Sequence, residues 1–126
     1  MGSVATGQIL IVEDESNIVE SLRFILEQAG FEVEIVSDGK AALSRLRRDR
    51  FGAVVLDLML PGMNGFDVLK AMRADAELAS LPVLVLTAKG QAQDRKTAEA
   101  IGANAFITKP FSNAEVVEQV RALSGA

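Results

Sequence analysis

The sequence predicts an α/β fold, in which a parallel sheet of five strands is covered on both faces by five helices. Short apolar runs alternate five times with segments whose apolar residues recur every three or four positions, the pattern of repeated βα units. Hydrophobic residues, mostly aliphatic, make up 49% of the 126 residues, enough to cover a sheet on both sides. Short connections and right-handed crossovers then favour a single doubly wound domain.

The first two βα units contain the expected edge strand. Residues 9–12 form an apolar run, and residues 16–29 carry apolar side chains at helical spacing up to Gly30, which predicts the end of a helix. Residues 32–36 alternate charged and apolar side chains, as a strand at the edge of a sheet does. A helix is predicted over residues 40–49.

The remaining three units begin with the expected central strand. Residues 53–56 are apolar throughout, which predicts a strand buried on both faces. Residues 58–64, with proline and glycine, predict a loop that leads to a helix over residues 65–74. The later predicted elements are a strand at 82–86, a helix at 91–101, a strand at 105–107 and a helix at 113–123. We expect residues 1–7 to be a disordered or cloning-derived leader and residues 8–124 to form the domain.

The composition excludes several classes of function. Without cysteine or histidine, the chain has no disulfide or thiolate site, and any imidazole must come from another molecule. The net charge of -4 argues against nucleic-acid binding, and the arginines of residues 45–50 are expected to form a solvated helix face. No apolar run approaches the length of about 18 residues needed to cross a membrane, and residues 1–7 lack the features of a signal peptide. We therefore expect a cytoplasmic protein.

Polar side chains follow the predicted strands at the edge where open α/β sheets bind ligands. Glu13 and Asp14 follow the first strand, Asp57 the third, Thr87 the fourth and Lys109 the fifth. Each has an ordinary explanation alone, such as helix capping or solvation, but those explanations do not account for one shared edge. Carboxylates 4 Å apart repel by roughly 4 kcal/mol per pair at an effective dielectric constant near 20. We therefore expect a Mg²⁺ ion among them.

Four segments resemble the receiver domains of two-component response regulators, which are CheY-like proteins. They are residues 11–15 (IVEDE), 54–65 (VVLDLMLPGMNG), 86–88 (LTA) and 107–111 (ITKPF). The resemblance covers residues 8–123 and includes the order and spacing of these segments. It implies a flavodoxin-like sheet with the strand order 2-1-3-4-5.

The resemblance also implies a role for each residue of the metal and phosphorylation site. Asp57 would be the phosphorylated residue. Glu13, Asp14 and Asp57 would bind Mg²⁺ through their carboxylates, and Met59 through its backbone carbonyl.

A second group of residues would respond to the phosphoryl group. Thr87 would bond a phosphoryl oxygen, and Lys109 would pair with the phosphate. A cis peptide between Lys109 and Pro110 would place the ammonium group. Phe106 occupies the position of the switch aromatic and would turn inward as Thr87 moves.

The implied function is signalling and not the turnover of a separate substrate. A sensor histidine kinase or a histidine phosphotransfer protein would donate the phosphoryl group, and the chain would catalyse its own phosphotransfer and slow dephosphorylation. The surface of the fourth helix, fifth strand and fifth helix would then change and act on an effector or output domain. A phosphorylation-dependent dimer is a further implied partner, although Asn104 and Ala105 replace the paired acids that the winged-helix subfamily uses.

Three other functions fit the sequence less well. A haloacid-dehalogenase-type phosphatase needs a second aspartate two residues after the nucleophile, where this chain has Met59. A flavodoxin-type flavin module needs a phosphate cradle after the first strand, where this chain has three consecutive acids, residues 13–15. A degenerate receiver used only for protein contacts would normally have lost Asp57 or Lys109, and both are present.

Overall fold

A computed structural model describes residues 7–88 and 92–125. The strands are β1 (Gln8–Val12), β2 (Glu32–Val36), β3 (Ala53–Asp57), β4 (Val83–Ala88) and β5 (Ala105–Lys109). The helices are α1 (Ser16–Gln28), α2 (Gly39–Arg48), α3 (Gly65–Ala74), α4 (Ala92–Ile101) and α5 (Asn113–Ser124). All strands pair in parallel in the order β2-β1-β3-β4-β5, which confirms the predicted fold class and the edge position of β2.

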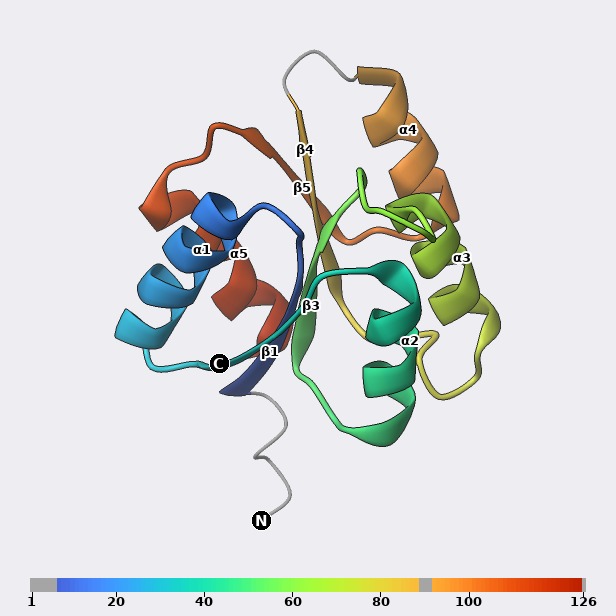
Figure 1. Ribbon diagram of the computed structural model, residues 1–126, viewed down its shortest axis with the longest axis horizontal. Helices are drawn as coiled ribbons and strands as arrows, with labels where there is room; N and C mark the ends of the chain where they lie inside the picture. Colours follow the sequence, from blue (N-terminus) through green and yellow to red (C-terminus); the bar gives the residue numbers. More distant parts are fainter. Residues whose placement is uncertain (1–6, 89–91, 126) are drawn as a thin grey trace.

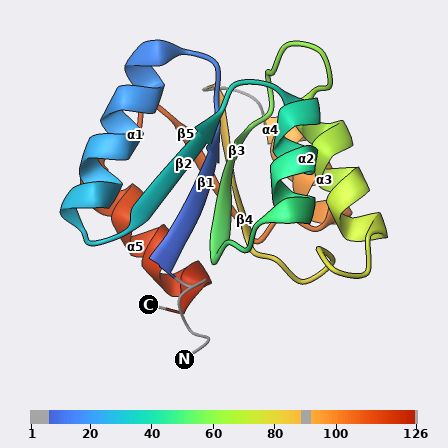
Figure 2. The same ribbon diagram turned by 60° about the horizontal axis from the view of Figure 1, so that its bottom comes forward.

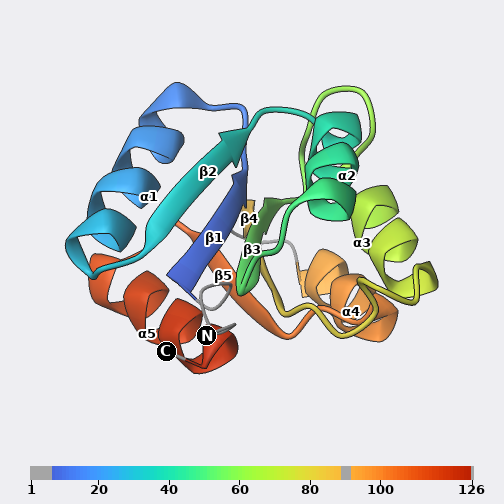
Figure 3. The same cartoon turned by 90° about the horizontal axis from the view of Figure 1, so that it is seen from below.

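The helices form two layers around the sheet. Helices α1 and α5 cover one face, and α2, α3 and α4 cover the other (Figures 1 and 2). Seen from below, β2 and β1 lie between these two layers, with α1 and α5 on one side (Figure 3). Each βα crossover thus places its helix on one of two faces, as the doubly wound prediction requires.

Alternating side chains of the central strands supply the two halves of the core. In β1, Ile9 and Ile11 pack towards α1 and α5, whereas Leu10 and Val12 pack towards α2, α3 and α4, and all four are fully buried. The same alternation continues through β3. Burial on both faces explains why these strands are unbroken apolar runs in the sequence.

Several elements differ from the predicted bounds. Strand β3 includes Asp57, and β5 extends to Lys109, two residues beyond the predicted end. Pairing continues through these polar positions, because Asp57 lies opposite Leu86 and Lys109 opposite Ala88 in the parallel ladder. The strand backbone is therefore satisfied by its neighbours whatever the side chain. Residues 1–6 of the predicted leader, and the predicted start of the fourth helix at residue 91, lie outside the described residues.

Side-chain caps begin three of the helices. The side chain of Asp38 accepts a hydrogen bond from the Ala41 N–H, so that α2 begins at Gly39, one residue before the predicted start. Asn64 and Ser112 cap α3 and α5 in the same way. These caps satisfy amide groups that a helix leaves unpaired at its first turn.

The basic stretch at the end of α2 is only partly a solvated face. Arg47 and Arg48 are more than half exposed, as expected. Arg45 lies instead between Glu34 of β2 at 2.9 Å and Asp49 at 3.0 Å.

None of the helices in the described part of the chain is both long and apolar enough to span a bilayer.

Gly65, at the start of α3, lies directly against the end of β3. A Cβ atom there would be 2.5 Å from the Asp57 carbonyl oxygen and 2.6 Å from the Leu58 Cα. Both of these atoms belong to the backbone and cannot rotate aside, so the close approach requires glycine at position 65. Gly62, in the preceding loop, is favoured for a different reason, because its φ of 72° lies in the left-handed region.

Gly65→Ala is therefore expected to destabilise the domain by about 1–3 kcal/mol, as overpacking does. For a domain of this size the midpoint of thermal unfolding should fall by about 4 °C for each kcal/mol. Gly7→Ala is the matched control, because no atom of the part of the chain that the structure describes lies within 4 Å of its added Cβ. Equal midpoints for Gly65→Ala and Gly7→Ala, measured by circular dichroism, would contradict this packing argument.

Candidate phosphoacceptor site

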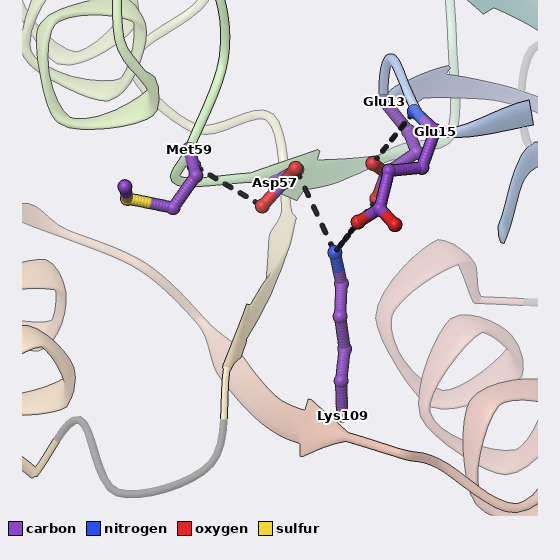
Figure 4. A network of polar contacts seen from close by, with 5 residues as sticks. All are labelled: Glu13, Glu15, Asp57, Met59 and Lys109. Carbon is purple, nitrogen blue, oxygen red and sulfur yellow. Dashed lines mark hydrogen bonds and ion pairs between the residues drawn. The ribbon is translucent and has the colours of Figure 1, made fainter.

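The predicted site residues meet at the carboxyl edge of the sheet. Glu13 follows β1, Asp57 ends β3, Thr87 lies near the end of β4 and Lys109 ends β5. Figure 4 shows the Asp57 carboxylate at the tip of β3 facing the Lys109 side chain, which reaches across from β5. The parallel topology brings these ends together, because β1 and β4 both pair with β3.

Three carboxylates form a compact acidic cluster. Glu13, Asp14 and Asp57 each offer an oxygen, and these oxygens lie within 4.8 Å of one another. Glu13 and Asp57 are 0% and 2% exposed, whereas Asp14 faces solvent. Hard oxygen donors, two buried and one open to water, fit Mg²⁺, which binds few carboxylates and keeps several waters.

Lys109 brings a positive charge to this cluster. Its Nζ lies 3.2 Å from Glu13 Oε1, 3.5 Å from Glu15 Oε1 and 3.7 Å from Asp57 Oδ2. Burial alone would lower the pKa of the ammonium group, but the charges of Asp57 and Glu13 outweigh burial and raise that pKa. Lys109 therefore remains protonated and offsets part of the repulsion. The peptide bond to Pro110 is cis.

The hydroxyl group of Thr87 is buried and unpaired among the described residues. The residue is 1% exposed, and no atom of residues 7–88 or 92–125 makes a hydrogen bond with its Oγ1. An unpaired buried hydroxyl costs free energy unless a ligand completes it. An anion held at Asp57 would supply the missing acceptor.

Comparison with known proteins identifies the family. Residues 9–121 match the response regulator receiver domain. The chain belongs to this family. The receiver is 43% identical over 115 residues to the sensory transduction protein RegX3 of Mycobacterium tuberculosis, a match that covers 91% of this chain and 49% of RegX3. It therefore spans about half the length of the curated relatives it matches.

Solved structures show the same fold. A putative response regulator from Chloroflexus aurantiacus has a TM-score of 0.92 and 32% identity, with 95% of this chain and 98% of that chain covered. The receiver domain of the sensor histidine kinase PA1611 from Pseudomonas aeruginosa has a TM-score of 0.88 and 29% identity, with 95% and 98% covered. These matches confirm the predicted family and fold, and they do not favour the phosphatase, the flavin module or the degenerate receiver.

Burial sets the acidity of Glu13 in this receiver. Burial, followed by the charge of Asp57, raises the pKa of Glu13 to about 7. Its Oε2 accepts a hydrogen bond from the Glu15 N–H at 3.2 Å, while Oε1 makes the ion pair with Lys109 but no aligned hydrogen bond. A cation at Oε1 would stabilise the charged carboxylate.

The loop after β3 holds the proposed acceptor. Asp57 Oδ1 accepts a hydrogen bond from the Met59 N–H at 3.1 Å, while Oδ2 is turned towards Lys109. The Met59 side chain is 71% exposed and extends away from Asp57 (Figure 4). Met59 thus contacts the site through its backbone, which leaves its carbonyl as the group that could serve a metal.

The predicted switch residue lies at the edge of the core. Phe106 is partly buried against the core beneath α2, α3 and α4. The guanidinium group of Arg95, on α4, lies 5.4 Å from the centre of the Phe106 ring, within the range of a cation–π interaction. The ring is therefore held between the core and a surface arginine.

Two residues that contact the site or the switch aromatic were not predicted from the sequence. Glu15 contacts Lys109, and the run of three acids at residues 13–15 was the available signal. Arg95 contacts Phe106, which no spacing rule predicts across two elements. Asn104 has a structural role at the opposite edge of the sheet, because it accepts hydrogen bonds from the N–H of Val83, the first residue of β4, at 2.9 Å and from Arg73 at 3.0 Å.

Proposed function

We propose that this receiver accepts a phosphoryl group on Asp57 and that Glu13, Asp14 and Asp57, with the Met59 carbonyl, hold the Mg²⁺ that the reaction needs. The observation that carries the proposal is the meeting of two buried carboxylates with one ammonium group at the end of the sheet. The PA1611 receiver domain has a magnesium ion coordinated in its active-site cleft, which supports the choice of ion. When bound, the ion would neutralise charge on the phosphoryl oxygens.

The chemical step is an in-line substitution at phosphorus. One carboxylate oxygen of Asp57 forms a bond to phosphorus while the bond from phosphorus to the donor's imidazole nitrogen breaks, and that nitrogen keeps the electron pair. Hydrolysis later returns Asp57 as a carboxylate and releases orthophosphate. The chain thus acts on itself and turns over no separate substrate.

Lys109 and Thr87 have complementary roles in this step. Lys109 Nζ, 3.7 Å from Asp57 Oδ2, is close enough to pair with an oxygen of a phosphoryl group on that carboxylate. Thr87 donates its unpaired hydroxyl to another phosphoryl oxygen. Movement of Thr87 towards the phosphoryl group would let Phe106 turn inward and change the surface of α4, β5 and α5. Moving such a switch from 1:99 to 99:1 takes about 5.5 kcal/mol, within reach of a few charge-assisted bonds.

The partners follow from this role. A sensor histidine kinase or a histidine phosphotransfer protein in the cytoplasm donates the phosphoryl group to the domain of residues 8–124. The changed surface then acts on an effector or output domain, and a phosphorylation-dependent dimer is one form this could take. A relative from Mycobacterium leprae, 42% identical over 115 residues, is named as the DNA-binding response regulator MtrA, so regulation of transcription is one output that fits.

The native chain is expected to gain the mass of one phosphoryl group when incubated with acetyl phosphate and Mg²⁺. Removal of the metal with excess EDTA should abolish this gain, because the carboxylate cluster then repels the anionic donor. Intact-mass spectrometry measures both. Labelling that is as fast without metal as with it would refute the role given to Glu13 and Asp14.

A further inference from the structure

Glu15 immediately precedes α1, but its side chain does not cap the helix. Its backbone is extended at the N-cap position, and its carboxylate makes no cap hydrogen bond. The side chain instead reaches Lys109, 94 residues further along the chain, with 3.5 Å between Oε1 and Nζ. Figure 4 shows the Glu13 and Glu15 carboxylates together on one side of the ammonium group and Asp57 on the other.

This contact changes where the charge of Lys109 is directed. The ammonium group is nearer to Glu13, at 3.2 Å, and to Glu15, at 3.5 Å, than to Asp57, at 3.7 Å. The oxygens of an incoming phosphoryl group must share that ammonium with both glutamates. Glu15 lies outside the cluster of Glu13, Asp14 and Asp57 whose oxygens are within metal-binding distance. Of the three carboxylates that form ion pairs with Lys109, the Glu15 carboxylate is therefore the one outside the proposed metal site.

We propose that Glu15 is a positioning residue that competes with the phosphoryl group for Lys109 and so slows phosphorylation of Asp57. This inference rests on the proposed function. The Glu15 side chain is 64% exposed, and an exposed ion pair contributes little, so its removal should accelerate the reaction about two- to fivefold. The Glu15 N–H that holds Glu13 belongs to the backbone and is kept in any substitution.

The test compares Glu15→Gln and Glu15→Asp with the native chain. Glu15→Gln removes the charge from Lys109, while Glu15→Asp keeps the charge at the mouth of the site but withdraws it by one methylene. Glu20→Gln is the matched control, because it removes an exposed acid of α1 that is not among the ion-pair partners of Lys109, which are Glu13, Glu15 and Asp57. The rate of mass gain from acetyl phosphate is measured at saturating Mg²⁺, together with the affinity for beryllofluoride, a phosphoryl mimic, by ¹⁹F NMR.

Both Glu15 variants should react faster and bind beryllofluoride more tightly by the same factor, with Glu20→Gln unchanged. A purely structural role for Glu15 would not tighten binding of the mimic. Acceleration in Glu15→Gln but not in Glu15→Asp would overturn the proposal, because net charge at the entrance would then be the cause. Native rates in both variants, or equal acceleration in Glu20→Gln, would overturn it as well. Failure of the native chain to react would instead refute the proposed function.

Discussion

Asp57→Asn should take up no phosphoryl group from acetyl phosphate and Mg²⁺ under conditions that label the native chain fully. The carboxamide has nearly the same shape as the carboxylate, and its oxygen can still accept the hydrogen bond from the Met59 N–H. It lacks the negative charge needed to attack phosphorus and gives up one ligand of the acidic cluster. The expected effect is therefore a loss of reaction and not a loss of folding.

The experiment needs a control for the same chemical change elsewhere. Asp67→Asn replaces an exposed aspartate in the first turn of α3 that belongs neither to the acidic cluster nor to the ion pairs of Lys109, and it should label like the native chain. Circular dichroism before labelling should show both variants folded. Labelling of folded Asp57→Asn at the native rate would exclude Asp57 as the acceptor.

Glu13→Gln is expected to weaken Mg²⁺ binding and, at pH 8, to make the metal-free protein more stable. Substitution of residues that only orient metal ligands already costs about 10–100-fold in affinity, so loss of a buried ligand should cost at least as much. The gain in stability follows from the pKa of Glu13, which is raised from 4.5 to about 7 by burial and by Asp57. Between pH 4.5 and about 7, the folded state therefore keeps a proton on Glu13 that the unfolded state has released.

The sign of the pH dependence follows from this difference. The favourable contribution of protonated Glu13 is complete below pH 4.5 and is lost as the pH rises through about 7. At about 1.4 kcal/mol per pKa unit, and with allowance for nearby Lys109, the loss amounts to about 1–3 kcal/mol. Glu13→Gln never carries this charge, so it should be more stable than the native chain at pH 8 and similar to it at pH 5.

Thermal unfolding at pH 5 and pH 8, with and without Mg²⁺, measures this effect, and calorimetric titration measures the metal affinity. In the native chain Mg²⁺ should raise the unfolding midpoint more at pH 8 than at pH 5, because protons compete with the ion for Glu13. In Glu13→Gln the ion should raise it little at either pH. A variant that is less stable than the native chain at pH 8 would contradict the cost of burying a charged Glu13. A variant that binds Mg²⁺ as tightly as the native chain would contradict the role proposed for Glu13 in the metal site.

The positions of the functional residues were predictable because chemistry and topology agree at one edge. Asp57, Thr87 and Lys109 come at the carboxyl ends of predicted strands, and parallel strands bring those ends together. The bounds of β3 and β5 were less predictable, since pairing with neighbours carries a strand through polar residues such as Asp57. Apolar runs mark what is buried, not where hydrogen bonding stops.

The five βα units, the acidic and basic groups of the site and the family could all be predicted from the amino-acid sequence, since they depend on side-chain type and spacing along the chain. Which of these groups are in contact could be learned only from the three-dimensional fold. Glu15 contacts Lys109 across 94 residues, Arg95 lies over Phe106, and Gly65 leaves room for the backbone of Asp57. Such contacts depend on distances of a few ångströms between elements that are remote in sequence, and local periodicity carries no information about those distances.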